Sequence, residues 1–117
     1  MKYLVVDDSK LARLSLIKSL QTNIGEVEVF QAVNGLEALA LMETERPSIV
    51  FLDLTMPEMD GYEVLPKLLT INANAKVIVV SADIQTKAKE RVIELGAQLH
   101  MQKPINADKM KEILDII

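Results

Sequence analysis

Short apolar stretches rich in β-branched residues recur along the chain, and longer amphipathic segments separate them. Three of these stretches, Leu4–Val6, Ile49–Leu52 and Val77–Val80, contain no polar position. A strand has this composition when helices bury both of its faces, as in a parallel sheet. We therefore predict five strands, at Tyr3–Val6, Val27–Gln31, Ile49–Leu52, Val77–Val80 and Leu99–Met101.

The segments between these strands carry one-sided apolar stripes at helical spacing. Each is expected to form a helix that lays one face on the sheet. Strands and helices that alternate in this way predict an α/β fold with a doubly wound parallel sheet. The residues expected to face the sheet are Leu11, Leu14, Ile17 and Leu20, then Ala38, Leu39 and Met42, then Val64, Leu65, Leu68 and Leu69, then Ile84, Ala88, Val92 and Leu95, and finally Met110, Ile113, Leu114 and Ile117.

The chain of 117 residues is half hydrophobic, which suits one domain with one aliphatic core. No linker, low-complexity stretch or charge block interrupts the pattern. We therefore predict a single domain over residues 1–117.

Composition excludes several classes of function. The chain has no cysteine and one histidine, His100, so thiol chemistry and a multi-histidine metal site within one chain are excluded. The net charge of −4 argues against direct binding to nucleic acid. No apolar run approaches the roughly 20 residues of a membrane span, and the first apolar run stops too early for a signal peptide. We expect a cytoplasmic protein.

Polar side chains follow four of the predicted strands, where ligands of an open parallel sheet bind. Because the carboxyl ends of parallel strands lie along one edge, these groups are expected to converge. They are Asp7 and Asp8 after the first strand, Asp53 and Thr55 after the third, Ser81 after the fourth, and Lys103 after the fifth.

Three carboxylates at one edge need compensating charge. Two like charges about 4 Å apart repel by about 4 kcal/mol at an effective dielectric near 20. Lys103 supplies one positive charge, and a divalent cation is the natural complement. Oxygen ligands favour a hard ion such as Mg²⁺, which also accepts phosphate oxygens. A carboxylate in this setting can act as the nucleophile of a phosphoryl transfer.

Five separate motifs resemble those of the receiver domains of two-component response regulators, and the resemblance covers essentially the whole chain. A chemotaxis receiver is also a stock example of the doubly wound fold. The motifs, in chain order, are Val5–Ser9, Asn34-Gly35 with Ala38-Leu39, Leu52–Pro57 with Met59–Gly61, Ser81-Ala82 with Gly96-Ala97, and Lys103-Pro104.

The resemblance implies a flavodoxin-like fold with strand order 2-1-3-4-5 and five flanking helices. It implies that Asp53 is the phosphoacceptor. Asp8, Asp53 and the Thr55 carbonyl would bind Mg²⁺ or Mn²⁺, and Asp7 would contact the ion through water. Ser81 and Lys103 would bind the phosphoryl group, and the peptide before Pro104 would be cis.

Two further positions concern regulation. The family usually has Tyr or Phe three residues before the site lysine, as a switch that moves with Ser81, but this chain has His100. One interpretation is that His100 is a half-exposed residue at the strand end that fits sterically. The other is that His100 makes the switch respond to pH, because imidazole titrates near neutrality. Thr55 and Asp83 occupy positions that tune the lifetime of the acyl phosphate in the family, although Asp83 could instead cap the fourth helix.

The resemblance also implies the partners: a histidine kinase or phosphotransfer protein, and an output protein or domain. The output partner would read the fourth helix, fifth strand and fifth helix, where Lys87, Arg91 and Glu94 are candidate contacts. The chain is expected to be a switch and not an enzyme, either a stand-alone receiver of the chemotaxis or phosphorelay type or a fragment of a longer regulator.

Three alternatives compete with this interpretation. A flavin carrier would need a hydroxyl- and glycine-rich phosphate loop after the first strand, where this chain has Asp7-Asp8. An aspartate-nucleophile phosphatase would usually carry a second aspartate at position 55, which is Thr55 here. The third is a degenerate receiver that binds partners without phosphorylation.

Overall fold

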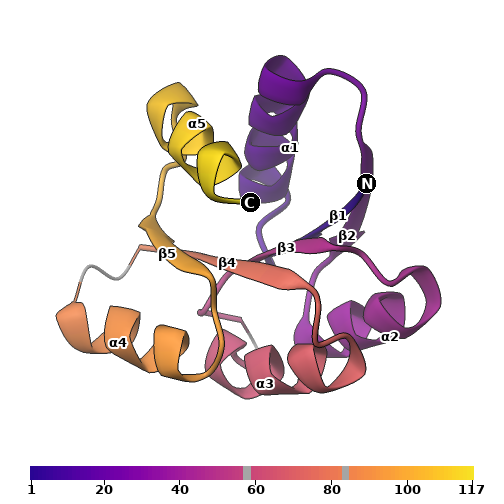
Figure 1. The fold of residues 1–117 in the computed structure, drawn as a ribbon, viewed down its shortest axis with the longest axis vertical. Coiled ribbons are helices and arrows are strands. Elements are labelled where there is room, and N and C mark those ends of the chain that lie inside the picture. The colour runs from indigo at the N-terminus through magenta and orange to yellow at the C-terminus, as the bar shows by residue number, and fades with distance from the viewer. Residues whose placement is uncertain (57–58, 83–84) are drawn as a thin grey trace.

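The computed structural model describes residues 1–56, 59–82 and 85–117. Within them, parallel strands form one sheet in the order β2-β1-β3-β4-β5, as predicted. Figure 1 shows that sheet with helices on both sides. The strands are β1 (Lys2–Val6), β2 (Glu28–Ala32), β3 (Ile49–Leu52), β4 (Lys76–Ser81) and β5 (Leu99–Gln102), and the helices are α1 (Lys10–Ile24), α2 (Gly35–Glu45), α3 (Gly61–Ile71), α4 (Thr86–Glu94) and α5 (Ala107–Ile116).

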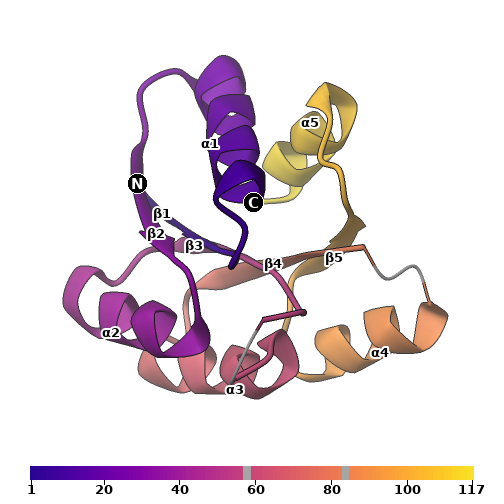
Figure 2. The ribbon, with the colours of Figure 1, turned by 180° about the vertical axis from the view of Figure 1, so that it is seen from behind.

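Helices α1 and α5 cover one face of the sheet, and α2, α3 and α4 cover the other (Figures 1 and 2). Successive residues of a strand point to opposite faces, so each buried strand contributes to two separate clusters. In β3, Val50 and Leu52 pack towards α2 and α3, whereas Ile49 and Phe51 pack towards α1 and α5. This double burial explains the continuous apolar runs within β1, β3 and β4, which are Leu4–Val6, Ile49–Leu52 and Val77–Val80.

The predicted stripe of α1 is wrong in its first half. Leu11 is 80% exposed and Leu14 is 45% exposed, so neither faces the sheet. The buried face of α1 consists of Arg13, Leu16 and Leu20, at the i, i+3, i+7 spacing of one helix face. The phase was misread because an arginine occupies a position that hydrophobic periodicity assigns to an apolar residue.

The other stripes agree with the structure where it describes them. The buried positions are Ala38 and Met42 in α2, Val64, Leu65 and Leu68 in α3, Ala88 and Val92 in α4, and Met110 and Ile113 in α5. Ile84 lies outside the described residues. No helix in the described ranges combines the length and the apolar character that a membrane span requires.

Candidate functional site

Asp7 and Asp53 lie at neighbouring strand ends, and the sheet fixes the backbone of both. The Asp53 amide donates to the carbonyl of Val6 at 2.9 Å, and the Asp7 amide donates to that of Ala32 at 3.1 Å. Both side chains are buried, with residue exposures of 5% for Asp7 and 6% for Asp53. Two carboxylates are therefore held in a poorly solvated position at the edge where the sequence predicts the site.

Asp8 completes an acidic cluster. Asp7, Asp8 and Asp53 each offer a carboxylate oxygen, and these three oxygens lie within 4.8 Å of one another. Asp8 is exposed, so the cluster has a side open to solvent. Three hard oxygen donors at this separation fit a divalent cation such as Mg²⁺. Thr55 is exposed, and its amide donates to the Asp53 carboxylate.

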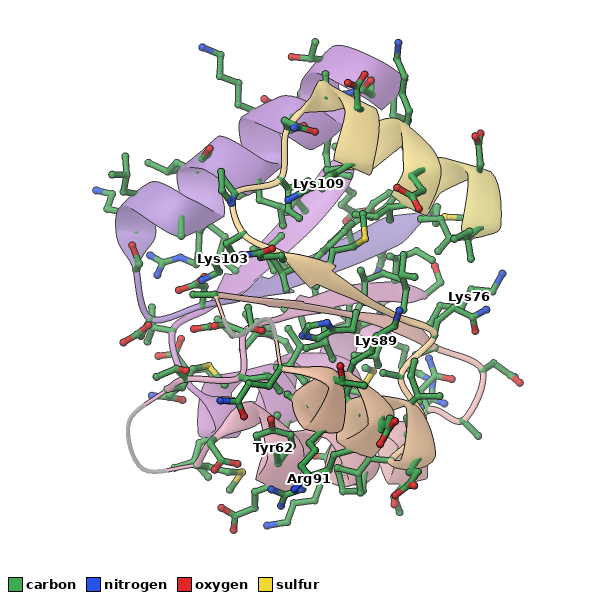
Figure 3. The ribbon with its side chains drawn as sticks, turned by 90° about the vertical axis from the view of Figure 1, so that its left-hand side faces the viewer. Tyr62, Lys76, Lys89, Arg91, Lys103 and Lys109 are labelled. Atoms are coloured by element: carbon green, nitrogen blue, oxygen red, sulfur yellow. The ribbon has the colours of Figure 1, made fainter. Side chains whose placement is uncertain are left out.

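Lys103 bridges the two buried carboxylates. Its Nζ lies 2.6 Å from Oδ2 of Asp7 and 3.4 Å from Oδ1 of Asp53. The backbone of Lys103 is held in place because its amide donates to the carbonyl of Ser81, at 2.8 Å. The Lys103–Pro104 peptide is cis. Figure 3 shows Lys103 at the end of β5, separate from Lys109 of α5.

Burial and neighbouring charges shift the pKa of both Asp53 and Lys103. Desolvation raises the pKa of Asp53 and the Asp7 charge raises it further, and Lys103 only partly offsets these effects. Burial by itself would lower the pKa of Lys103, but its hydrogen bond to Asp7 and the two carboxylate charges outweigh burial and raise it. Lys103 is thus held as an ammonium between two carboxylates that repel each other.

Ser81 and His100 are joined across the last two strands. Oγ of Ser81 and Nε2 of His100 are 3.0 Å apart, and Ser81 is buried at the end of β4. His100 is half-buried on β5. The side chain expected to bind a phosphoryl group is therefore in direct contact with the residue that departs from the family pattern. Asp83 lies outside the described residues.

Two basic residues near the site were not singled out from the sequence. Lys109 of α5 donates to the carbonyls of Gln102 and Pro104, at 2.8 and 3.3 Å, and so ties α5 to the segment that carries Lys103 (Figure 3). Arg13 of α1 is buried beside Asp7. The sequence carries no signal for the burial of Arg13, because a buried helix face seldom includes a charge.

Gly61 allows the segment after Asp53 to fold back onto the start of α3. A Cβ at this position would lie 2.6 Å from the carbonyl oxygen of Asp53 and 2.7 Å from Cα of Leu54. The amide of Gly61 also donates to the carbonyl of Leu54 at 3.0 Å. The glycine is therefore required by the close approach of the two backbones.

Gly61→Ala should lower the free energy of unfolding by about 1–3 kcal/mol, the range for overpacking that forces backbone to move. Urea denaturation monitored by circular dichroism measures this change. Gly25→Ala is the control, because Gly25 has φ +91° but no atom within 4 Å of the added Cβ, so that only local strain is introduced. A Gly61→Ala protein as stable as the wild type would contradict the observed approach.

Comparison with known proteins now decides the family. Residues 3–115 match the response regulator receiver domain. The chain belongs to this family. Receiver domains are phosphoacceptor switches of two-component signalling, not enzymes in the usual sense, and they generally bind Mg²⁺ at an acidic pocket such as the one formed here.

Receiver relatives match nearly the full chain. Sporulation initiation phosphotransferase F of Bacillus subtilis is 37% identical over 111 residues, which cover 95% of this chain and 88% of the relative. Chemotaxis protein CheY of Listeria monocytogenes is 39% identical over 115 residues, covering 98% and 96%. A chain from the CheX–CheY–BeF₃–Mg²⁺ complex of Borrelia burgdorferi superimposes with a TM-score of 0.90 at 28% identity, covering 97% of this chain and 86% of that one.

Proposed function

We propose that residues 1–117 form a single receiver domain that accepts a phosphoryl group on Asp53 and signals through the resulting change in its surface. One observation carries the proposal. The buried carboxylate of Asp53 lies between a lysine at 3.4 Å and two further carboxylates whose oxygens are within 4.8 Å. A receiver needs a nucleophile, a cation to receive phosphoryl charge and a metal-binding acid pair, and this arrangement supplies all three.

In the proposed reaction, a carboxylate oxygen of Asp53 attacks phosphorus as the bond from phosphorus to the donor breaks. The donor is a phosphohistidine of a kinase or phosphotransfer protein, or a small acyl phosphate, and the leaving group retains the electron pair. Lys103 is placed to bind an oxygen of the transferred group, since its Nζ lies beside both carboxylates. Hydrolysis by water later releases phosphate and restores the carboxylate, at a rate that Thr55 and Asp83 would tune.

Mg²⁺ or Mn²⁺ would be held by Asp8, Asp53 and the Thr55 carbonyl, with Asp7 in contact through water. When bound, the ion supplies positive charge to the oxygens of the transferring phosphoryl group. Asp7 suits an indirect role, because one of its oxygens already accepts from Lys103 and the other accepts from the Ser9 amide at 2.9 Å. The exposure of Asp8 suits a direct one.

The proposed switch is Ser81 with His100. A phosphoryl group on Asp53 would take a hydrogen bond from Ser81, and the 3.0 Å contact with His100 carries that change to β5. The surface affected is α4, β5 and α5, where an output protein or domain would bind. The Arg91 guanidinium of α4 lies 4.0 Å from the centroid of the Tyr62 ring of α3, a cation–π contact between the two helices. Both residues are labelled in Figure 3.

His100→Phe tests whether the histidine makes the switch respond to pH. A protonated imidazole can only donate to Ser81, which turns the hydroxyl hydrogen towards the phosphoryl site. Beryllofluoride affinity in saturating Mg²⁺ should therefore tighten a few-fold from pH 8 to pH 6 in the wild type, the effect of about one hydrogen bond. The same titration of the Phe variant corrects for the pH dependence of the probe. Parallel pH profiles for the two proteins would exclude the switch.

The test of the proposed function is a mass measurement. The protein is incubated with acetyl phosphate, with and without Mg²⁺, and intact masses are compared with those of Asp53→Ala. One phosphoryl adduct that needs both Mg²⁺ and Asp53 is the expected result. A folded wild-type protein that forms no adduct and binds no beryllofluoride would instead be a degenerate receiver. The proposal also includes a cytoplasmic location, and no direct binding to nucleic acid or membrane.

A further inference from the structure

Arg13 is a buried cation whose position is unfavourable for three reasons: its burial, its lack of a charged partner among the described residues and the helix dipole. It is 8% exposed, on the sheet-facing side of α1. Among residues 1–56, 59–82 and 85–117, no carboxylate lies within salt-bridge distance of its guanidinium. It also lies in the first turn of α1, where the helix dipole repels a positive charge and where this helix has no acidic residue. Buried arginines usually have a charged partner, so this one needs another explanation.

The hydrogen bonds of Arg13 supply that explanation. Nη1 donates to the backbone carbonyl of Asp7 at 2.8 Å, and Nε donates to the side-chain oxygen of Gln31 on β2 at 3.0 Å. The Asp7 carbonyl belongs to the peptide unit that links Asp7 to Asp8. Arg13 therefore fixes the plane of the one peptide that sets how the two aspartates are oriented relative to each other.

Asp7 and Asp8 differ in the number of hydrogen bonds that hold them in place. The Asp7 carboxylate accepts from the Ser9 amide and from Lys103, and its amide donates to Ala32. The side chain of Asp8, in contrast, is exposed, and within the described residues no hydrogen bond or ion pair holds its carboxylate. The position of Asp8 in the acidic cluster thus depends on the peptide that Arg13 holds.

We propose that Arg13, itself anchored by Gln31, is a positioning residue that sets the affinity of the acidic cluster for divalent cations. This inference rests on the proposed function, since it assumes that Asp8 is a ligand. Loss of an outer-shell partner of this kind typically weakens metal affinity by about 10–100-fold. Arg13 acts through backbone geometry and not through its charge, which by simple attraction and repulsion would weaken the binding of a cation.

Two variants separate geometry from charge. Arg13→Lys keeps the positive charge but lacks the planar fork that reaches two acceptors. Gln31→Ala keeps Arg13 and its charge but removes the acceptor for Nε. Ile113→Val is the matched control, because Ile113 is fully buried on α5 and its truncation costs about 0.5–1.5 kcal/mol without touching the loop.

The experiment is calorimetric titration of the metal-free proteins with Mg²⁺, together with thermal unfolding and hydrogen exchange at the Ser9 amide, which donates to the Asp7 carboxylate. The dissociation constant for Mg²⁺ should rise about tenfold in Arg13→Lys and severalfold in Gln31→Ala. Exchange at the Ser9 amide should accelerate in both variants without metal. Ile113→Val should lower the melting temperature and leave both other readouts unchanged.

Three results would overturn the inference. Wild-type affinity in Arg13→Lys and Gln31→Ala would make Arg13 a structural residue or a counter-charge. Weakening in all three variants in proportion to their loss of stability would indicate a general effect on the fold. A wild-type protein that binds no Mg²⁺ would remove the proposed function itself, and since the wild type is titrated first, that failure is distinguishable from the others.

Discussion

Lys103→Met should slow phosphorylation of Asp53 by acetyl phosphate by at least about 100-fold in saturating Mg²⁺. The lysine Nζ is 3.4 Å from the Asp53 carboxylate, so it is placed to stabilise negative charge on the transferring phosphoryl group. Removal of one such preorganised donor commonly costs about 10²–10³ in rate. The rate is measured as accumulation of the phosphoryl adduct by intact mass, over a range of Mg²⁺ concentrations.

Lys103→Met should also increase the affinity of the site for Mg²⁺. Without the ammonium, Asp7 and Asp53 lose the positive charge that balances them, so Mg²⁺ should bind more tightly while the saturated rate falls. Lys109→Met is the matched control, because Lys109 contacts carbonyls of the same segment and no site carboxylate. It should leave the saturated rate within about twofold. A Lys103→Met protein that is phosphorylated as fast as the wild type would remove the lysine from the mechanism.

Asp53→Asn should make the metal-free protein more stable than the wild type at neutral pH, by an amount on the order of 1 kcal/mol. Burial and the nearby Asp7 charge raise the pKa of Asp53 above that of the unfolded chain. The ionised carboxylate therefore costs stability in the folded protein, and an uncharged amide of the same size removes that cost. Urea denaturation in the presence of a chelator measures the difference.

The difference in stability between Asp53→Asn and the wild type should depend on pH. Above the folded-state pKa of Asp53 the full penalty is present, so the excess stability of Asp53→Asn should be constant there. As pH falls from the raised folded-state pKa towards the lower pKa of the unfolded chain, the wild-type carboxylate gains its proton first in the folded protein, and the excess should vanish. Saturating Mg²⁺ should reverse the order at neutral pH, because it stabilises the protein that binds it. An Asn variant less stable than the wild type without metal would show that Lys103 outweighs burial and Asp7.

The parallel sheet followed from the sequence because the strands are buried on both faces, and its strand order followed from the resemblance to receiver domains. The runs Ile49–Leu52 and Val77–Val80 could pack only between two layers of helices, and the structure divides their side chains between both layers. The same topology explains why residues as distant in sequence as Asp7, Asp53 and Lys103 could be assigned to one edge of the sheet from the sequence.

The prediction from hydrophobic periodicity was wrong where a charged residue occupies a buried position. In α1 the apolar pattern selected Leu11 and Leu14, but Arg13 takes the buried position because its hydrogen bonds to Asp7 and Gln31 offset the loss of hydration. Periodicity cannot anticipate a buried charge whose partner is a backbone carbonyl. Ser81 and His100 were also predicted as candidate residues, but the contact between them was not, because it depends on the register of β4 and β5.

The most direct test of the central claim locates the phosphoryl group on the chain. After phosphorylation by acetyl phosphate and Mg²⁺, borohydride reduces an aspartyl phosphate to homoserine, and peptide mass spectrometry identifies the residue changed. Conversion is expected at residue 53 alone, at a level matching the intact-mass adduct and absent without Mg²⁺. Conversion at Asp7 or Asp8, or an adduct that borohydride leaves intact, would contradict the assignment of Asp53 as the phosphoacceptor.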